Sequence, residues 1–522
     1  MSSHDDGHCP PTCPVCCPCG DEGRAEGGIT RRGFVGGSAA ALGGMALTGL
    51  SWSALAAAKK GKVPMPPARR PLVVKPIFVY STPRRRAKTS WRNWGGIQTQ
   101  ADADKEKARI TDELDQLEKA ADFPVTFLPV AAVRSARELA GAKDMADADV
   151  VILYPAGGWT DVFNTVEKAG KDTIVFVRHK SGPLYLWYEI VHPRYLRRHG
   201  DNLAVKGVDY QDVVVDSPKE ILWRLRALCG LRNTVGSRIV AVGGPGGWAT
   251  RKAPDLARDR WKLDIRTVAY KDLGELIKAA RADKAVVERS RKRAEAYLKL
   301  PGTTLETERQ FVDRCFELDE IFRALMTKAD CRAMTINACM GTIMRVSETT
   351  ACLPLSTLND DGYLAFCESD FVVIPAGLLM GNITGHPPFL LNPTYPHDGI
   401  MTMAHCTAPR KMDGKTLEPA RIVTHFESDY GAAPKVDMRI GQKLTLIGTD
   451  FAAKKWIGCS GRIVGHPFLP ICRSQLEVQF ACDSALLAER MQGFHWMIVY
   501  DDYLREAAYA LKRTAIAFES LG

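Results

Sequence analysis

Residues 363–409 read YLAFCESDFVVIPAGLLMGNITGHPPFLLNPTYPHDGIMTMAHCTAP and contain two apolar runs that each end on polar groups. An apolar run ends at Glu368, and Asp370 follows two positions later. A second apolar run, strand-like in pattern, ends at His405 and Cys406. Carboxylate, imidazole and thiolate groups all bind metal ions. Two segments of buried character therefore each end on groups that are able to bind a metal.

The same stretch resembles the sugar ketol-isomerase family of L-fucose isomerase and L-arabinose isomerase. In that family a Glu-x-Asp step is followed by a small-residue helix, a Gly-x-Pro turn and a strand with a second acidic ligand. Here Cys-Glu-Ser-Asp at 367–370, Gly-His-Pro at 385–387 and His-Cys-x-Ala-Pro at 405–409 stand in matching order. The resemblance extends from about residue 236 to the C-terminus.

The resemblance implies a role for each polar group that matches the family pattern. Glu368 would be a metal ligand and the catalytic base, His495 a ligand, and His405 a ligand or an oxygen-binding group. Asn337 ends an apolar strand near this site, and Arg473 lies in the region matching the family's β unit, so both are predicted to bind substrate. Mixed carboxylate and imidazole ligands with open positions suit Mn²⁺ or another divalent cation.

One position departs from the family pattern. Where the family has an acidic residue, this chain has Asn392, whose amide could bind a metal weakly or contact substrate but cannot exchange a proton. Moving a carbonyl between two sugar carbons takes a proton from one carbon and returns it to the other through an ene-diolate. Asp398, or else Asp370, is therefore predicted to supply the second catalytic carboxylate. Without it, the chain would bind a sugar or a metal and not isomerise it.

Each of these residues also has a purely structural interpretation. Glu368 or Asp370 would serve at a helix N-terminus, where Asp is a favoured capping residue. His405 on an apolar run and His495 beside Trp496 would be core histidines with satisfied hydrogen bonds. Their joint occurrence in family order favours the functional interpretation.

Composition limits the class of protein. A chain of 522 residues that is 46% hydrophobic can bury more than one core, and a content of 25% charged residues is typical of folded soluble domains. The net charge of +10 is scattered along the chain, with no nucleic-acid motif beside it. No nucleic-acid partner is therefore predicted.

Residues 1–56 are interpreted as an export signal. Thr-Arg-Arg-Gly-Phe-Val at 30–35 is a twin-arginine signature, a Gly- and Ala-rich apolar run follows, and Ala-Leu-Ala at 54–56 is a cleavage pattern. The protein is therefore predicted to be periplasmic or otherwise exported, with membrane contact only during export; an uncleaved membrane anchor is the alternative. The cysteine cluster at 9–19 would be discarded with the signal. The other ten cysteines are predicted to be small core residues.

From residue 71 on, apolar runs alternate with charged helical stretches, which predicts βαβ units and a parallel sheet. Ligands gather at the carboxyl ends of such strands. The post-strand loop 81–96 carries Trp91 among arginines, a combination suited to stacking on a sugar and bonding its hydroxyls. An exposed basic loop is the alternative, and loop 155–159 is a second candidate.

The strand at 238–242 leads into the glycine-rich turn 243–247 and begins a second α/β unit. The turn lacks the GxGxxG spacing because Ala249 stands where the third glycine belongs, so no dinucleotide is predicted. Residues 420–480 carry short alternating runs punctuated by glycines, which predicts a small antiparallel barrel. A terminal helix is predicted to about Phe518.

These patterns predict an α/β fold with two Rossmann-like parallel-sheet domains followed by a C-terminal antiparallel β-barrel-like domain, as in L-fucose isomerase. The predicted parts are a signal peptide (1–56), a linker (57–70), an N-terminal α/β domain (71–210), a central α/β domain (211–385) and a C-terminal β-rich domain with a terminal helix (386–522).

The predicted function is a metal-dependent aldose–ketose isomerase acting on a sugar. The alternative from another class is a carbohydrate-binding protein on the same fold with a lapsed proton-transfer pair. An exported oxidoreductase would rest on the twin-arginine signature alone and lacks a cofactor motif. The resemblance also implies a homo-oligomer, a trimer or hexamer, with sites formed between subunits.

Overall fold

The structure is a computed structural model, and it describes residues 45–56, 63–93, 96–157, 160–181, 191–198, 200–205 and 207–522. The predicted twin-arginine signature, the cysteine cluster before it, residues 57–62 of the predicted linker and the end of loop 155–159 lie outside the described residues. Within the described ranges, no helix combines the length and the apolar composition needed to cross a bilayer.

The first parallel sheet is formed by strands between residues 72 and 215. Its order is β3 (Val125–Phe127), β2 (Leu72–Val79), β5 (Val150–Pro155), β6 (Asp172–Val177) and β7 (Val213–Val215), with β4 (Ala131–Val133) also paired to β2. Helices α3 (Gln100–Ala120), α4 (Ala136–Ala140) and α5 (Thr160–Lys168) lie in the connections. Strand β5 is buried along its whole length, as expected for a parallel strand covered on both faces. The predicted βαβ pattern of this region is confirmed.

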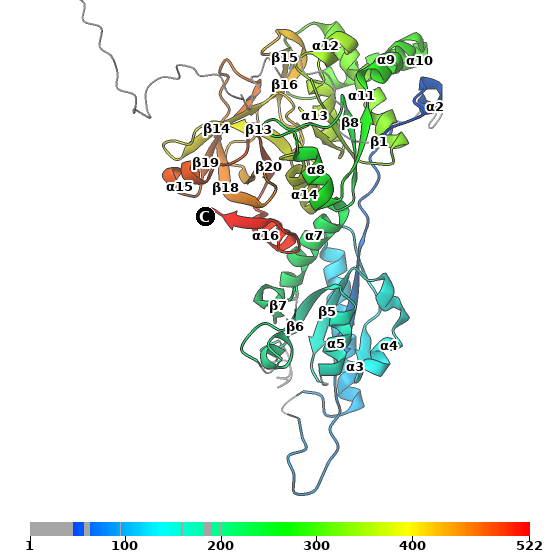
Figure 1. The fold of residues 1–522 in the computed structure, drawn as a ribbon, viewed down its shortest axis with the longest axis vertical. Coiled ribbons are helices and arrows are strands. Elements are labelled where there is room, and N and C mark those ends of the chain that lie inside the picture. Colours follow the sequence, from blue (N-terminus) through cyan, green and yellow to red (C-terminus); the bar gives the residue numbers. More distant parts are fainter. Residues whose placement is uncertain are drawn as a thin grey trace, which may run out of the picture. The chain divides into compact units, whose positions relative to one another are not determined.

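The second sheet is also parallel and places the site described below. Its order is β1 (Met45–Ala46), β9 (Asp264–Val268), β8 (Arg238–Val242), β11 (Ala333–Ile336) and β12 (Leu364–Phe366). Figure 1 labels β1 and β8 of this sheet. The helices that follow its strands include α8 (Ala253–Trp261), α9 (Tyr270–Ala282), α10 (Lys284–Leu298), α11 (Arg309–Lys328), α12 (Thr342–Ser347), α13 (Cys352–Asp360) and α14 (Ile374–Thr384). Because β8, β11 and β12 are adjacent and parallel, the segments after them meet at one edge of the sheet.

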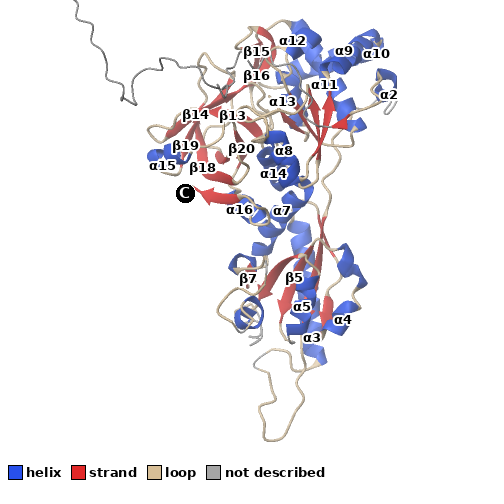
Figure 2. Cartoon of the chain, viewed as in Figure 1, coloured by secondary structure: helices blue, strands red, loops and turns tan. Residues whose placement is uncertain are grey.

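The third unit is a closed barrel of six antiparallel strands in the described part of the chain. Around the ring they are β17 (Lys443–Thr449), β20 (Trp496–Tyr500), β13 (Phe389–Pro393), β14 (Ile400–His405), β19 (Ser474–Phe480) and β18 (Lys455–Gly465), and pairing of β17 with β18 closes it. Figure 2 shows these strands in red, whereas blue helices flank the parallel sheets. The predicted barrel is thus confirmed as a structure, although the boundaries of the predicted domains stay a prediction.

Membership of the barrel differs from the sequence-based prediction. The alternating run near residue 421 forms β15 (Ala420–His425), which lies outside the barrel in a small sheet with β16 (Tyr430–Val436) and β10 (Thr303–Leu305). Strands β13, β14 and β20 instead come from outside the 420–480 region. Alternation marks a strand with one buried face but does not say which strands pair with it.

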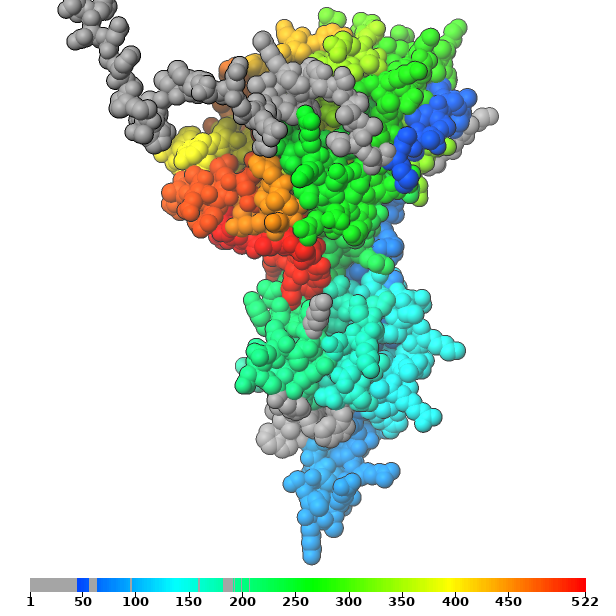
Figure 3. Space-filling model, viewed as in Figure 1, coloured from blue at the N-terminus to red at the C-terminus, as the bar shows by residue number. Residues whose placement is uncertain are grey.

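The predicted terminal helix ends earlier than about Phe518. Helix α16 covers Leu504–Leu511, and β21 (Ala517–Ser520) pairs in parallel with β18. In Figure 3 these last residues, in red, lie against the orange residues of the barrel. The Phe518 ring packs over Gly458, where an added Cβ would be 2.5 Å from the ring. A strand here buries Phe518 against the barrel, and this packing overrides the helical pattern.

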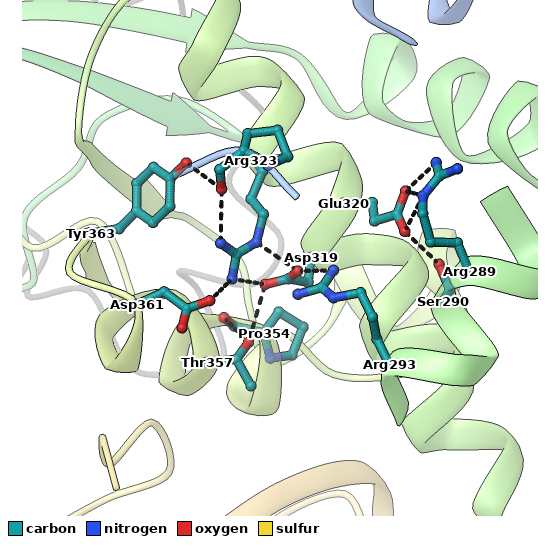
Figure 4. A network of polar contacts seen from close by, with 11 residues as sticks. Arg289, Ser290, Arg293, Asp319, Glu320, Arg323, Pro354, Thr357, Asp361 and Tyr363 are labelled. Atoms are coloured by element: carbon teal, nitrogen blue, oxygen red, sulfur yellow. Dashed lines mark hydrogen bonds and ion pairs between the residues drawn. The ribbon is translucent and has the colours of Figure 1, made fainter. Parts of the chain in front are cut away.

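Helix α11 carries a buried ionic network (Figure 4). Arg323 donates two hydrogen bonds to the Asp319 carboxylate, at 2.8 and 3.1 Å. Arg293 forms an ion pair with Asp319 at 2.6 Å, and Asp361 accepts from Arg323 at 2.7 Å. The side chains of Asp319 and Arg323 are only 1% and 0% exposed. Opposite charges and hydrogen bonds compensate for the desolvation of both groups.

The same network holds the described part of the predicted linker. Arg323 and the Tyr363 hydroxyl both donate to the backbone oxygen of Pro64, each at 3.1 Å (Figure 4). Further along, Arg69 donates to the backbone oxygen of Asn382 in α14 at 2.8 Å. Residues 63–70 are therefore an extended segment bound to the protein surface.

Candidate metal centre

Glu368, His405 and His495 come together although they are distant in the sequence. One ligating atom of each lies within 4.8 Å of those of the other two. His405 Nε2 is 3.6 Å from Glu368 Oε1, and His495 Nε2 is 3.3 Å from Glu368 Oε2. The Glu368 side chain is 12% exposed and the two imidazoles are 3% and 0% exposed. This group could hold a metal ion.

Glu368 occupies a strained turn at the end of β12. Its φ is +62° and that of Ser369 is +47°, in the left-handed region that side chains disfavour. The Ser369 N–H donates to the Thr335 hydroxyl of the neighbouring strand at 3.1 Å, which fixes the turn. Such conformations cost on the order of 1–3 kcal/mol each and cluster at functional sites. The strain directs the Glu368 side chain to the two histidines and not along the strand.

Asp370 orients His495 from behind. Its Oδ2 lies 2.7 Å from His495 Nδ1, and the Val372 N–H donates to its Oδ1 at 3.1 Å. With Nδ1 bound to a carboxylate, His495 presents Nε2 toward Glu368. This is the outer arrangement that metal-binding histidines commonly have. The sequence pointed to Asp370 as a stand-in catalytic carboxylate, whereas the structure gives it this positioning contact.

Neither carboxylate caps the first residue of α14. Helix α14 begins after the N-cap residue Val373, and no side chain makes a capping hydrogen bond there. Instead, α14 starts with a proline in its first turn, which needs no hydrogen bond from its own nitrogen. Asp370 accepts from the Val372 N–H in the turn before the helix through Oδ1, and its Oδ2 contacts His495.

His405 ends β14 and lies opposite Ser474 of β19. Neither ring nitrogen of His405 forms a hydrogen bond within the described residues, and the same holds for Nε2 of His495. An unpaired buried polar atom costs about 1–3 kcal/mol, and such atoms are rare. The interpretation of His405 as a satisfied core histidine therefore fails, whereas one free nitrogen from each imidazole beside a carboxylate fits a ligand set.

The charges of the cluster depend on one another. Burial would raise the pKa of Glu368, but the contacts with His405 and His495 outweigh burial and hold this pKa well below its usual range. Burial would lower the pKa of His495, but Asp370 and Glu368 outweigh it and raise this pKa to about 9. Without metal, the two carboxylates thus hold a proton on His495. A bound cation would replace that proton, as is general for metal ligands.

Trp248 is a site residue that sequence reasoning did not single out. Its indole N–H donates to Glu368 Oε2, and its ring stacks on Phe494 with centroids 4.5 Å apart. The Phe494 side chain remains 41% exposed. Together they form an aromatic wall beside the cluster.

The glycine-rich turn 243–247 explains how Trp248 reaches the site. Gly246 forms an isolated bridge to Asp370, and its N–H donates to the Ser369 oxygen at 3.2 Å. At Gly247, an added Cβ would lie 2.6 Å from the Ala253 side chain. Gly246 thus joins the Glu368 turn through its backbone, and Gly247 leaves room for Ala253, so this run was the sequence signal for Trp248.

Asn337 and Asn392 lie next to the cluster. Asn337 follows β11, its Oδ1 accepts from the Ala338 N–H at 2.8 Å, and its side-chain nitrogen borders Gly246. Asn392 is in β13, which runs between β14 and β20, the strands beside His405 and His495. It pairs with Ala404, immediately before His405. The Asn337 side chain and the Asn392 backbone thus lie near the predicted site.

Arg473 is near the cluster but has other partners. It precedes Ser474, the residue opposite His405. Its guanidinium donates to the backbone oxygen and the hydroxyl of Thr424, at 2.6 and 3.0 Å, and lies 5.2 Å from the Phe426 ring centroid. These contacts tie β19 to β15, so the structure gives Arg473 a bracing role.

Two predicted site residues are not brought to the cluster by any described contact. Asp398 lies in the turn between β13 and β14 with its side chain 92% exposed, bonded to His397 at 3.0 Å. Its φ of +51° is a turn conformation that Asp tolerates well. Trp91 lies in the loop after β2, where its ring contacts the Arg92 guanidinium at 5.2 Å. No described contact joins Asp398 to Glu368, and its role as the second catalytic carboxylate stays a prediction.

No known protein-family model matches the chain, and no curated protein matches it. The family is therefore not shown. The α/β class with parallel sheets and an antiparallel barrel is observed directly, and the likeness to L-fucose isomerase stays a prediction.

Proposed function

We propose that the chain is a divalent-metal-dependent aldose–ketose isomerase. The observation that carries the proposal is the group of Glu368, His405 and His495, with one carboxylate and three unbonded imidazole nitrogens in a nearly buried site. A mixed carboxylate and imidazole donor set fits Mn²⁺ and related divalent ions. The group also lies at the carboxyl end of a parallel strand, where α/β folds bind ligands.

The residues divide the chemistry of a carbonyl shift between them. A divalent ion held here would stabilise the charge on the oxygens of an ene-diolate. His495, fixed by Asp370, is a ligand and not a proton carrier. His405 has both ring nitrogens unbonded, so it is the group able to pass a proton to a substrate oxygen. Glu368 is the base nearest to the substrate carbons in this proposal.

The surroundings of the centre suit a sugar. Trp248 and Phe494 offer stacked aromatic faces, and the exposed part of Phe494 opens to solvent. Flat apolar faces pack well on the C–H surfaces of a pyranose or an open-chain sugar. Asn337 and Asn392 add amide groups that can bond hydroxyls.

The placement of Asp398 favours a second candidate, a carbohydrate-binding protein that holds a metal and a sugar without turnover. Only one carboxylate, Glu368, faces the described centre, because Asp370 is bonded to His495 and Asp398 is exposed. A lone carboxylate whose pKa lies well below its usual range is a weak base at neutral pH.

The remaining parts of the proposal are export and assembly. We propose export by the twin-arginine route, and a trimer or hexamer as the resemblance implies. Sedimentation of the purified protein, and its distribution between periplasm and cytoplasm with Arg31 and Arg32 replaced by lysine, test these two parts.

The first experiment is metal analysis of the full chain purified without chelator. The control is Glu489→Gln, because the Glu489 side chain is 69% exposed. Wild type and this control are both expected to hold near one manganese or similar ion per chain. Glu368→Gln is expected to lose it. A wild type that takes up no metal even after reloading contradicts the isomerase.

The second experiment separates the two candidates. The metal-loaded protein is incubated with a panel of aldoses, ketose formation is measured, and sugar binding is followed by calorimetric titration. Ketose from any aldose, lost in Glu368→Gln, supports the isomerase. Binding without ketose from any of them selects the carbohydrate-binding protein.

A further inference from the structure

Two cysteine thiols also lie next to Glu368. The Sγ atoms of Cys339 and Cys367 are 3.4 Å apart. With a carboxylate oxygen of Glu368 they form a second group whose ligating atoms all lie within 4.8 Å of one another. Cys367 is buried and Cys339 is half-buried, so the pair is reached from one side. The proposed sugar chemistry makes no use of either thiol.

The parallel pairing of β11 and β12 brings the thiols together. Thr335 is the partner of Phe366 in the ladder, so the two segments that follow β11 and β12 leave the sheet side by side. Each then takes a left-handed residue next to its cysteine, Ala338 with φ +51° and Glu368 with φ +62°. Two strained residues at one sheet edge are unusual for a plain packing contact and typical of a built site.

The thiols and the histidines form two positions and not one. Ligands of a single ion lie at most about 4.6 Å apart, twice a metal–sulfur distance of about 2.3 Å. With Glu368, the cysteines form one group within 4.8 Å and the histidines form another, both close to this limit, and the five side chains do not form a single group of that kind. One ion cannot bind all five side chains, so Glu368 is the carboxylate that the two groups share.

The sulfur separation distinguishes a metal pair from a disulfide. Two thiolates on one tetrahedral ion stand about 3.8 Å apart, whereas sulfurs in a disulfide stand about 2.05 Å apart. The Cys367 thiol donates to Cys339 Sγ at 3.4 Å, so the sulfurs are in contact without a covalent bond and would move apart by only about 0.4 Å to share such an ion. Thiolates prefer soft or borderline ions, unlike the carboxylate and imidazole set beside them.

We infer that Cys339, Cys367 and Glu368 form a second cation site that takes a soft divalent ion such as Zn²⁺ or Cd²⁺. Glu368 is shared, so occupation of the thiolate site changes the affinity of the histidine site for its own ion. The inference goes beyond the proposed isomerase and holds whether or not the chain acts on a sugar.

The test is a Cd²⁺ titration of the reduced full chain, followed by the ultraviolet charge-transfer band of cadmium thiolates. The five cysteines of residues 9–19 are replaced by serine in every sample, because they would also bind cadmium. Cys339→Ser and Cys367→Ser are expected to weaken Cd²⁺ binding at least tenfold and to reduce the band. The control is Cys229→Ser, a buried thiol that contacts Pro124 instead.

The histidines separate this inference from the proposed function. His405→Ala and His495→Ala are expected to lose manganese and keep the cadmium band. Equal cadmium binding by wild type and both cysteine variants overturns the inference while leaving the manganese result standing. Loss of the band in the histidine variants alone also overturns it.

Alkylation of Cys339 tests the inference if the cysteine variants fail to fold, because it leaves Cys339 and Cys367 unchanged in the sequence. Cd²⁺ is expected to slow alkylation of Cys339 at least tenfold, read by mass spectrometry of the peptide. Unchanged alkylation, or a disulfide between Cys339 and Cys367 in the protein as isolated, overturns the inference.

Discussion

The ionic network of α11 and the metal centre both bury charged groups. Only in the network do the buried charged groups face partners at hydrogen-bonding distance. Asp319 faces two arginines at distances between 2.6 and 3.1 Å. Burial would raise its pKa, but Arg323 and Arg293 outweigh burial and lower it. In the metal centre, Glu368 meets its two histidines only at 3.3 and 3.6 Å, and three imidazole nitrogens lack hydrogen bonds in the described structure.

The difference indicates what each cluster is for. A completed ionic network holds α11, the segment at Pro64 and the turn at Asp361 in one arrangement. Incomplete coordination and a strained Glu368 cost free energy in the protein alone, and a ligand that binds there recovers part of it. The network is therefore expected to govern stability, and the centre to govern binding.

The largest expected effect comes from breaking the network. Asp319→Ala leaves the buried Arg323 with Asp361 as its remaining carboxylate and the half-buried Arg293 without Asp319, which costs on the order of 3–5 kcal/mol of the free energy of unfolding. Asp313→Ala in the same helix removes only a partly exposed pair with Arg309, worth about 0.3–0.5 kcal/mol. Denaturant unfolding of both variants measures the contrast, and similar losses would contradict it.

Metal addition is expected to stabilise the centre and leave the network unaffected. At a free Mn²⁺ concentration about 100 times Kd, the free energy of unfolding rises by about 2.7 kcal/mol. The same gain is expected in Asp319→Ala, because the two clusters share no residue. His495→Ala should gain nothing. Unfolding curves with Mn²⁺ and with chelator test this, and a gain that depends on Asp319 would show that the clusters are coupled.

Asp370→Asn sharpens the comparison inside the centre. Loss of the carboxylate behind His495 is expected to weaken metal binding about 10–100-fold, or about 1.4–2.7 kcal/mol, while the protein stays folded. Asp398→Asn is the matched control, and no change is expected because its side chain is exposed. Calorimetric titration measures both. Weaker binding in Asp398→Asn would show that Asp398 reaches the site after all.

The smallest expected effect is the pH dependence of the network. The pKa of Asp319 is lower in the folded protein than its unfolded value of about 3.9, so its stabilisation is complete above that value. This stabilisation is lost as pH falls through the lower pKa of the folded protein. The loss is about 1.4 kcal/mol for each pH unit between the folded and unfolded pKa values of Asp319. Asp319→Asn should lack this acid loss. Parallel stability curves of the two proteins between about pH 6 and pH 2 would contradict the assignment.

Much of the fold follows from local pattern. Apolar runs between charged helical stretches predict β2, β5 and β6, and the alternation after residue 420 predicts an antiparallel unit. Glu368, His405 and His495 are also predictable, because each lies next to a buried strand, where polar side chains emerge at the edge of a sheet. These features depend on residues close together in the chain.

Tertiary structure alone decided the rest. The sequence does not show that β13, β14 and β20 close the barrel, because a strand's period of two marks its buried face and not its partner. It does not show that Asp370 lies behind His495, that Trp248 reaches Glu368, or that Asp398 stays in solvent. Each of these depends on which distant segments pair, and pairing is set by the packing of the whole core and not by the local residues.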